Sequence, residues 1–554
     1  MDHPGNKVLT ANASVSSNFF ESDRILRDYL NEYASPKALK YMRGKLFDLG
    51  GDAATVMDSL SMDADKNEPE LIRRTPHGEP LNRIQFHPSY WVLLDIAGRS
   101  EMFYVKYDPE LREIYSADRH KLGFAAGSLY AMSELGQYCP LCMTDGAAVV
   151  IDKFADDSDK KRLIPRLSSR NGDGLFTGAM YLTEKAGGSD VGQNRTTATK
   201  VEDDIYHLNG EKWFCSNANA DVILALARTD PVEKGTRGLS LFLVEKKLED
   251  GSRNPMDIIR LKEKMGVRSM ATAEVMFTNT VGKKIGDEGE GFKVMAEMVN
   301  MSRLYNAVAA VSGTRRAIIE AWQYLNYRVT FGKRAVEHPM IRQKFTELGA
   351  KYVAGFLLTW RTIRALDAAE NGDEREKTLL RILTPMTKWW TAENSVYSVR
   401  ECMELMGGNG YIEGFIMPKL FRDVNVLPIW EGSGNIIVLD ILRAIKKTNA
   451  LDALANEIRS AEYKLVNDRL ERLLKQIKSL PEDDPDIAEP SAKVLFDELI
   501  RLTQTGLVIK EAQNNSHTWA EPAAEWLLES LDNDFRLQRA PSLKKVESLI
   551  GWEV

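Results

Sequence analysis

Pro428-Ile-Trp-Glu-Gly-Ser-Gly-Asn435 places a single carboxylate, Glu431, between an apolar pair and a turn that contains two glycines. Residues 436–447 carry apolar side chains at helical spacing, so the stretch predicts an irregular turn immediately before a helix. The flanking isoleucine and tryptophan should partly desolvate Glu431, which raises the pKa of a carboxyl group and makes it a better base near neutral pH. The alternative is that Glu431 only caps the helix at Ser433.

The size and composition of the chain are those of an ordinary soluble globular protein, with 554 residues, 44% hydrophobic and 28% charged, and a net charge of -7. Such a length allows three or four domains. The chain contains no run of eighteen apolar residues and no signal or transit pattern. We therefore expect a cytoplasmic protein without a membrane partner, or a mitochondrial one whose transit peptide has been removed. The acidic charge gives no reason to expect a nucleic-acid partner.

The four cysteines are too few for a disulfide framework and indicate a reducing compartment. Cys139 and Cys142 have the spacing of a redox or zinc-ligand pair, but no second pair or nearby histidine completes a tetrahedral site. The other interpretation is two buried small residues. Since the seven histidines are scattered, we expect no metal site.

The pattern of apolar residues changes several times along the chain. The predicted domains are an N-terminal arm, a helical domain, a β-domain, a helical bundle and a helical extension, at residues 1–35, 36–174, 175–284, 285–447 and 448–554. Short β-branched and aromatic runs indicate about six or seven strands in the β-domain, with Asn209-Gly210 as a hairpin turn. The long helices after it should pack as a bundle. An acidic linker at 481–490 should interrupt the extension.

This order of elements lacks the alternation of strands and helices that a doubly wound sheet requires. Neither Gly-x-Gly-x-x-Gly nor Gly-x-x-x-x-Gly-Lys-Ser/Thr occurs, so a nucleotide cofactor would have to be held in another way. The predicted fold class is α+β, mainly helical.

Two turn-rich stretches of the β-domain carry candidate binding residues. Met180-Tyr-Leu-Thr-Glu-Lys-Ala-Gly-Gly-Ser-Asp190 could offer backbone N–H groups to a pyrophosphate. Glu211-Lys-Trp-Phe-Cys-Ser-Asn217 contains an aromatic pair that could lie against a planar ring, with Ser216 beside it. Taken alone, the stretches fit a tight turn and a core aromatic pair better than a cofactor site.

Together with the octapeptide around Glu431, these stretches resemble the acyl-CoA dehydrogenase family. Its members carry, in order, Thr-Glu-x-x-x-Gly-Ser-Asp, Lys-x-Trp-Ile-Thr-Asn, Arg-x-x-Phe-Gly, Gly-Gly-x-Gly and Glu-Gly-Thr/Ser, and this chain has a counterpart of each between about residues 36 and 447. Ile-Trp-Glu-Gly-Ser-Gly-Asn is similar to the AidB-like subgroup, which also has an N-terminal arm and a C-terminal helical extension. The resemblance implies an N-terminal helical domain, a central small β-barrel or sandwich, a four-helix bundle and an added helical extension.

The resemblance also implies FAD as cofactor and assigns its contacts. The positions that match FAD contacts are Met180, Leu182, Thr183, Ser189, Phe214, Ser216, Ser433 and Asn435. Those that match contacts to FAD in a neighbouring subunit are Arg328, Phe331, Glu404 and Gly408, which implies an oligomer, a homotetramer built as a dimer of dimers. The positions that match substrate contacts are Ser189, Arg303 and Gly432.

Some positions depart from the family pattern. Asn300 replaces an aspartate that contacts CoA, Pro339 replaces a glutamine that contacts FAD, and Glu404 stands where many members have glutamine. Each departure weakens one of the implied contacts. Simpler interpretations also stay open: Arg328 as a surface ion pair, Glu404 as a charge on a helix face, and Phe214 as a core aromatic.

The activity implied is α,β-dehydrogenation of a medium- to long-chain fatty acyl-CoA to the trans-2-enoyl-CoA. Glu431 would take the Cα proton while hydride leaves Cβ for flavin N5, and electrons would pass to an electron-transfer flavoprotein. One alternative is a DNA-associated flavoprotein of the alkylation response. Residues 451–554 disfavour it, because they carry 13 Lys and Arg but 20 Asp and Glu. Another alternative, a protein that sequesters acyl-CoA with slow turnover, would use the same binding residues.

Overall fold

The computed structural model describes residues 16–514, 517–532 and 540–553, and the remainder of the predicted N-terminal arm, 1–15, lies outside the described residues. The chain forms two compact units, each assembled from separate stretches of sequence. The described parts of 1–55, 115–133 and 306–554 form one unit, here called the helical unit. Residues 56–114 and 134–305 form the other, here called the β-unit.

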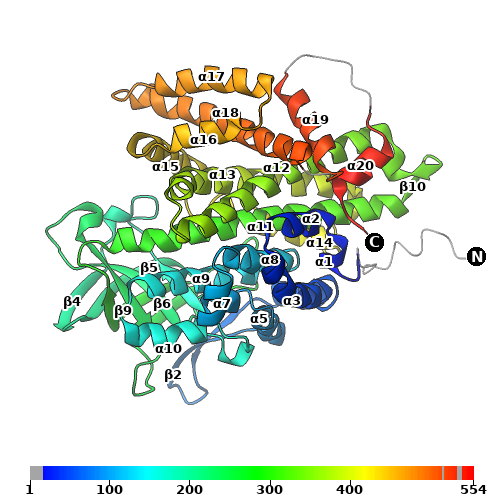
Figure 1. Ribbon diagram of the computed structural model, residues 1–554. Helices are drawn as coiled ribbons and strands as arrows, with labels where there is room; N and C mark the ends of the chain where they lie inside the picture. Colours follow the sequence, from blue (N-terminus) through cyan, green and yellow to red (C-terminus); the bar gives the residue numbers. More distant parts are fainter. Residues whose placement is uncertain (1–15, 515–516, 533–539, 554) are drawn as a thin grey trace, which may run out of the picture. The chain divides into compact units, whose positions relative to one another are not determined.

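The helical unit consists almost entirely of helices (Figure 1). Its elements are α1 (Phe19–Ser22), α2 (Arg24–Tyr33), α3 (Pro36–Ala54), α8 (Arg119–Ala131), the part of α11 (Gly291–Tyr327) that follows residue 305, β10 (Val329–Thr330), β11 (Lys333–Arg334), α12 (Pro339–Glu370), α13 (Glu374–Leu405), α14 (Ile416–Val424), α15 (Gly434–Lys447), α16 (Ala450–Arg459), α17 (Lys464–Lys478), α18 (Pro485–Asn514), α19 (Ala520–Leu531) and α20 (Leu543–Ile550).

The centre of this unit is the pair α12 and α13, whose apolar side chains are buried on several faces. A proline starts α12, and the Asp373 side chain caps α13 by accepting from Arg375 N and Glu376 N. Helices α16, α18 and α19 of the extension pack on this pair, as Figure 1 shows in orange and red. The break in the extension is shorter than the predicted linker, because α18 already begins at Pro485 and contains Pro490.

The described part of the predicted arm, 16–35, is packed inside the helical unit rather than extended. Asp23 at the start of α2 accepts two hydrogen bonds of 2.9 Å from Arg315 of α11. The same guanidinium donates to the Gly551 carbonyl at 3.1 Å. Arg315 is 2% exposed, so one buried cation ties both ends of the described chain to α11.

The β-unit combines a closed sheet with short helices. Its elements are α4 (Val56–Lys66), β1 (Glu70–Arg74), β2 (Pro80–Gln85), α5 (Pro88–Arg99), α6 (Tyr104–Tyr107), α7 (Pro109–Ile114), α9 (Leu135–Phe154), α10 (Asp157–Leu167), β3 (Gly178–Tyr181), β4 (Thr197–Glu202), β5 (Ile205–Ser216), β6 (Val222–Arg228), β7 (Leu239–Glu245), β8 (Met256–Leu261), β9 (Thr272–Ile285) and the part of α11 up to residue 305.

Strand pairing closes this sheet into a small barrel. The order is β3-β6-β4-β5-β9-β7, with β8 paired to β9. Because β7 also pairs with β6, the strands β6, β4, β5, β9 and β7 close into a ring, and β3 lies beside β6. Inward-facing side chains of these strands fill the core, among them Leu208, Phe242, Val275 and Phe277. The seven strands confirm the predicted fold class, α+β and mainly helical, with a small β-barrel between helical segments.

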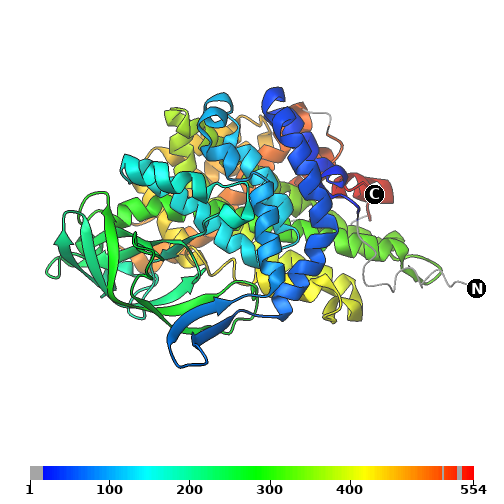
Figure 2. The ribbon, with the colours of Figure 1, turned by 90° about the horizontal axis from the view of Figure 1, so that it is seen from below.

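Two local predictions for the sheet differ from the structure. Asn209-Gly210 is not a hairpin turn: β5 continues through it, and the register against β9 shifts there as a β-bulge. The turn into β5 lies at Asp203, whose φ is 32°. In addition, β1 and β2 form a hairpin within the segment predicted to be mainly helical. Figure 2 shows this hairpin in blue beside the green strands, where β1 contacts β8.

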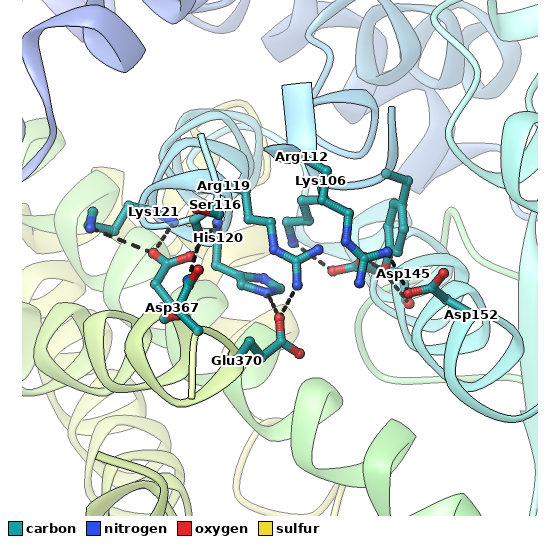
Figure 3. Close-up of polar contacts among 12 residues, drawn as sticks. Lys106, Arg112, Ser116, Arg119, His120, Lys121, Asp145, Asp152, Asp367 and Glu370 are labelled. Carbon is teal, nitrogen blue, oxygen red and sulfur yellow. Dashed lines mark hydrogen bonds and ion pairs between the residues drawn. The ribbon is translucent and has the colours of Figure 1, made fainter. Parts of the chain in front are cut away.

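Each unit also buries charged side chains, drawn in Figure 3. In the helical unit, the Glu370 carboxylate at the end of α12 lies 2.6 Å from His120 Nε2 and forms an ion pair with the Arg119 guanidinium. In the β-unit, Lys106 and Asp145 are both fully buried and lie 2.6 Å apart. Because a buried charge without a partner is costly, these pairs fix how the helices that carry them pack.

The described residues also bear on the expectations about the cysteines, a metal site and a membrane-spanning helix. Cys139 is half-buried and Cys142 buried on α9, both as free thiols. No cluster of three or more His, Cys, Asp or Glu side chains within the described ranges could hold a metal ion. None of the helices described is both long and apolar enough to cross a membrane.

Candidate functional site

The two motif stretches of the β-unit are joined by hydrogen bonds. Trp213 N donates to the Thr183 carbonyl at 3.0 Å. Beside this bond, the Lys212 ammonium donates to the Glu184 carboxylate at 2.6 Å, and both side chains are buried. Glu184 also accepts from Arg195 N at 2.6 Å. The chain that leaves β3 is therefore fixed against β5 by what we call the Glu184–Lys212 brace.

The surroundings of the Glu184 carboxyl keep it ionised at pH values where an ordinary glutamate would take up a proton. Burial alone would raise the pKa of Glu184, but the charge and hydrogen bond of Lys212, with the backbone donors of Thr196 and Arg195, outweigh burial and hold that pKa below its usual value. Burial lowers the pKa of Lys212, and the nearby Glu184 charge opposes that effect. A satisfied, buried ion pair of this kind positions its neighbours and is not itself available to a ligand.

The aromatic pair of β5 lies outside the barrel core. Phe214 is 56% exposed, and the register against β9 shifts between Lys212 and Cys215, which adds a residue to β5 at the aromatic pair. The Lys262 ammonium lies 3.6 Å from the centre of the Trp213 ring. The core interpretation of Phe214 is therefore wrong, and its ring is accessible to a planar ligand.

The other predicted flavin contacts lie at the ends of the neighbouring strands. Met180 pairs with Leu224 across the parallel β3–β6 ladder, and Ser216 ends β5. The Leu182 carbonyl, just beyond β3, accepts from Asn194 Nδ2 at 2.6 Å. All three predicted residues are half-buried, so each is held by its strand while part of it stays accessible.

A tight turn at residues 184–187 follows β3, as the sequence predicted. Glu184 N donates to the Gly187 carbonyl at 2.9 Å, and Gly187 N donates back at 3.1 Å. Gly188, Ser189 and Asp190 are exposed. The turn therefore presents backbone N–H groups next to the strand ends, and with the exposed Phe214 ring these residues fit an FAD, whose pyrophosphate needs donors and whose isoalloxazine needs an aromatic neighbour.

The predicted substrate-binding arginine lies on α11 of the same unit. Arg303 is 7% exposed, one helical turn from the half-buried Asn300. A guanidinium this deeply placed is a strong partner for an anionic or carbonyl group. Its contact with the CoA end of a substrate stays a prediction.

Glu431 lies in the helical unit on a turn of unusual conformation. Its φ is 59° and that of Gly432 is 100°, so both residues adopt left-handed backbone, which costs a residue other than glycine about 1–3 kcal/mol. The N-cap of α15 is Ser433, whose side chain makes no capping hydrogen bond. The ammonium of Lys388, in the middle of α13, donates to the Gly432 carbonyl at 2.7 Å. The predicted turn before a helix is confirmed.

The motifs predicted to reach a neighbouring subunit meet at one tyrosine of the helical unit. The Tyr324 hydroxyl accepts from Arg328 Nη1 at 3.1 Å and from Asn409 Nδ2, next to Gly408, at 2.9 Å. Phe331 forms the tip of the β10–β11 hairpin with a φ of 49° and is 98% exposed.

The structure also bears on the simpler interpretations of two charged residues. No ion pair of Arg328 occurs within the described residues, so a surface ion pair does not account for it. Glu404 does pair with Arg400, one turn earlier on α13, at 2.5 Å. This contact supports Glu404 as a charge on a helix face. Pro339, another departure from the family pattern, starts α12.

Three supporting residues escaped the sequence prediction, namely the brace partners Glu184 and Lys212 and the buried Lys388. The first two stood inside motifs already singled out, but nothing in the sequence indicated that they pair with each other. A weak signal existed for Lys212, since it follows Tyr206 and Leu208 at inward positions of one strand. For Lys388 the only signal was a charge between apolar neighbours on a predicted helix.

Comparison with known protein families assigns most of the chain up to residue 446. Residues 179–280 match the model for the acyl-CoA dehydrogenase middle domain and 289–446 that for the acyl-CoA dehydrogenase C-terminal domain. Residues 10–174 match the N-terminal domain of the adaptive response protein AidB. The three matches cover most of the chain.

Individual proteins agree with these matches. Acyl-CoA dehydrogenase family member 11 of Caenorhabditis elegans is 31% identical over 83% of this chain and 76% of its own length. The putative acyl-CoA dehydrogenase AidB of Escherichia coli K12 is 34% identical over 71% of this chain and 72% of its own. The crystal structure of Caenorhabditis elegans ACDH-11 in complex with C11-CoA superposes with a TM-score of 0.87 at 29% identity, covering 94% of this chain and 92% of that one.

Proposed function

We propose, because this chain belongs to the acyl-CoA dehydrogenase family, that it is an FAD-dependent dehydrogenase that converts medium- to long-chain fatty acyl-CoA to the trans-2-enoyl-CoA. Glu431 is the base that removes the Cα proton. The observation that carries the assignment is the strained turn at Glu431 and Gly432, held by a buried lysine immediately before α15. Backbone strain that the surroundings enforce is typical of functional residues.

The family's members are FAD-dependent flavoproteins, and the β-unit offers the surface for the cofactor. When bound, FAD accepts the hydride that leaves Cβ of the substrate. Phe214 would lie along the planar ring system, and Thr183 and Ser216 would contact its edge. The exposed turn at Gly188 and Ser189 would take the pyrophosphate, while the brace beneath holds these groups in place.

Proton removal needs a carboxylate that is ionised and aimed. An α-proton beside a thioester is weakly acidic, so a correctly placed general base contributes about a hundred- to ten-thousand-fold in rate. Arg303 would bind the CoA end of the substrate, with Ser189 and Gly432 as further substrate contacts. The relative solved with C11-CoA supports an acyl chain of medium length or longer.

The assembly we propose is a homotetramer whose FAD sites include residues of a second subunit. Phe331 supports it, because with Tyr327 and Val329 it leaves three large apolar side chains exposed within five residues, and such a concentration is typical of an interaction surface. Arg328 and Gly408 would reach the same FAD from that subunit. Changing Phe331 to serine should leave folding intact yet lower both the assembly mass by light scattering and the affinity for FAD by fluorescence titration. An unchanged mass and affinity would contradict this assembly.

The decisive test of the function is Glu431→Gln. The variant should bind FAD as the wild type does, but undecanoyl-CoA should reduce its flavin at least a hundredfold more slowly under anaerobic conditions. The matched control is Glu462→Gln, because Glu462 is another glutamate with positive φ in the helical unit. The flavin of this variant should be reduced at the wild-type rate. Equal rates for Glu431→Gln and wild type would remove Glu431 from the role. An electron-transfer flavoprotein is the proposed acceptor.

The AidB match favours a second candidate, a DNA-associated flavoprotein. The acidic balance of residues 451–554 opposes it, since DNA binding draws its affinity from cations. A salt-sensitive gel shift on duplex DNA at micromolar protein would support this candidate, and no shift at low salt would reject it. The remaining alternative is that the protein only sequesters acyl-CoA. Multiple turnovers with an artificial electron acceptor would reject this alternative.

A further inference from the structure

The turn that carries Glu431 is held from one side by a charged group that no family motif includes. Lys388 reaches from the middle of α13 to the Gly432 carbonyl, 2.7 Å from its Nζ. Its side chain is 1% exposed. A fully buried ammonium is retained only where its hydrogen bonds are worth more than its hydration, so its place directly after the base calls for a reason.

Backbone bonds anchor the turn on both flanks but do not account for its centre. Before it, Trp430 N donates to the Val426 carbonyl at 3.0 Å. After it, Ile437 N donates to the Ser433 carbonyl at 3.0 Å and starts α15. Lys388 bonds the segment between these anchors, where the backbone has the left-handed conformation.

Helix α13 gives Lys388 a rigid base. The residue before it, Thr387, is fully buried and its hydroxyl lies 2.8 Å from that of Thr362 on α12. Trp389, the residue after it, is 8% exposed. The backbone at Lys388 therefore cannot shift away from the turn without disturbing the α12–α13 contact at the centre of the unit.

Other charged groups surround the turn, but on its exposed side. Glu393 of α13 lies near Gly434, and Lys493 of α18 donates to Asn435 Oδ1 at 3.1 Å. Asp497 of α18 lines the same cavity as these two side chains. All three residues are exposed, so water screens Glu393 and Lys493, whereas burial of the Asp497 carboxyl raises its pKa. The charge of Lys388 acts through protein.

We propose that Lys388 is a positioning residue for the base: it fixes the Glu431–Gly432 turn and places a positive charge beside the carboxylate that must take the proton. The inference rests on the proposed function of Glu431. A hydrogen bond to the following carbonyl fixes where the Glu431 side chain leaves the backbone, and a nearby cation favours the ionised form of a carboxyl group. The two effects can be separated by removing the charge alone or the charge and the donor together.

The experiment compares Lys388→Met, which removes both, with Lys388→Gln, which keeps a donor, and Lys388→Arg, which keeps the cation. Lys419→Met is the matched control, because Lys419 is equally buried in the helical unit and pairs with Asp423 on its own helix, α14. For each FAD-loaded protein, the rate of flavin reduction by saturating undecanoyl-CoA is measured from pH 6 to pH 9, together with the dissociation constants of FAD and undecanoyl-CoA.

We expect Lys388→Met to slow reduction by about a hundredfold, the usual cost of a small misplacement of a catalytic group. The pH at half-maximal rate should rise by roughly one pH unit as the cation is lost. Lys388→Gln should recover part of the rate but keep the shifted profile, and Lys388→Arg should restore the profile. Both dissociation constants should stay within about twofold of wild type, and Lys419→Met should keep the wild-type rate and profile per bound FAD.

Wild-type rate and pH profile in Lys388→Met or Lys388→Gln would overturn the inference, as would a loss matched by Lys419→Met. If none of the three Lys388 variants yields FAD-bound protein, Lys388 serves folding alone and the inference is also overturned. Failure of the proposed function has a different signature: undecanoyl-CoA would not reduce the wild-type flavin, or would reduce Glu431→Gln as fast as wild type.

Discussion

The Glu184–Lys212 brace of the β-unit and the Glu431–Gly432 turn of the helical unit hold motif residues by opposite means. The brace is a buried ion pair between the turn after β3 and strand β5, and its carboxylate is further satisfied by backbone donors. The turn has two successive residues with positive φ and is held against α13 by the Lys388 ammonium. One region gains its order from satisfied interactions, while the other keeps strain that its surroundings enforce.

The difference follows from what each region has to do. A cofactor stays bound through many turnovers, so its platform benefits from a stiff sheet whose polar groups are internally paired. A base must project from the backbone at a fixed angle and keep its own carboxylate available for a proton. A left-handed turn achieves that projection at a cost in stability, which is a common compromise at functional sites.

Breaking the brace should have the largest effect on stability. Lys212→Met leaves the Glu184 carboxylate buried without its cation, which typically costs 3–5 kcal/mol. Urea unfolding followed by circular dichroism measures the loss, and FAD affinity should fall with it because Thr183 and Trp213 lose their support. The double variant Glu184→Gln/Lys212→Met should recover part of the stability, since neither charge is left alone. A single variant as stable as wild type would show that the brace does not hold the sheet.

The brace also predicts a pH dependence with a definite sign. The pKa of Glu184 is lower in the folded protein than its usual value, so its contribution to stability is complete above the unfolded pKa of about 4.3 and is lost as pH falls toward the folded pKa. The free energy of unfolding of the wild type should therefore fall more steeply below pH 5 than that of the double variant. Parallel curves would contradict an ionised Glu184.

The tight turn within the first motif stretch, at residues 184–187, should show a smaller effect, of steric origin. A Cβ at Gly187 would lie 2.4 Å from the Asp190 carbonyl oxygen, so Gly187→Ala must displace backbone and should cost about 1–3 kcal/mol. Gly188→Ala is the matched control, because its Cβ would meet only Thr183 Cγ2 at 3.4 Å. Thermal unfolding should separate the two variants, and equal stability would mean that the turn is not tight in solution.

The same contrast explains what the sequence could predict. The fold class, the turn before α15 and the stretches around Thr183 and Phe214 were accessible, because they depend on local periodicity and on motif resemblance. The brace was not, since Glu184 and Lys212 are far apart in sequence, and the weak sign that Lys212 faces inward does not identify its partner. Lys388 was missed for a related reason: only the packing around α13 buries it.

The errors in the sheet have the same origin. Asn209-Gly210 has the composition of a hairpin turn, and Gly210 does adopt a φ of 147°, but the ladder with β9 absorbs the dipeptide as a bulge. The dipeptide correctly predicted an unusual backbone conformation, but it did not predict that the strand would continue through it. The β1–β2 hairpin was missed because its strands carry few buried side chains, so they lack the clear alternation by which a half-buried strand is recognised.

The strain at Glu431 gives the smallest expected effect and the sharpest test of the comparison. At an ordinary helical position such as Asn394 of α13, glycine should be about 1 kcal/mol less stable than alanine. At position 431 the order should reverse, because alanine keeps the cost of positive φ and glycine does not, so Glu431→Gly should be about 1 kcal/mol more stable than Glu431→Ala. Comparing two variants that both lack the carboxylate cancels every contact the side chain makes, and both should fail to reduce their flavin. If alanine is the more stable at both positions, the turn is relaxed, and the base and the cofactor platform would be held by the same means after all.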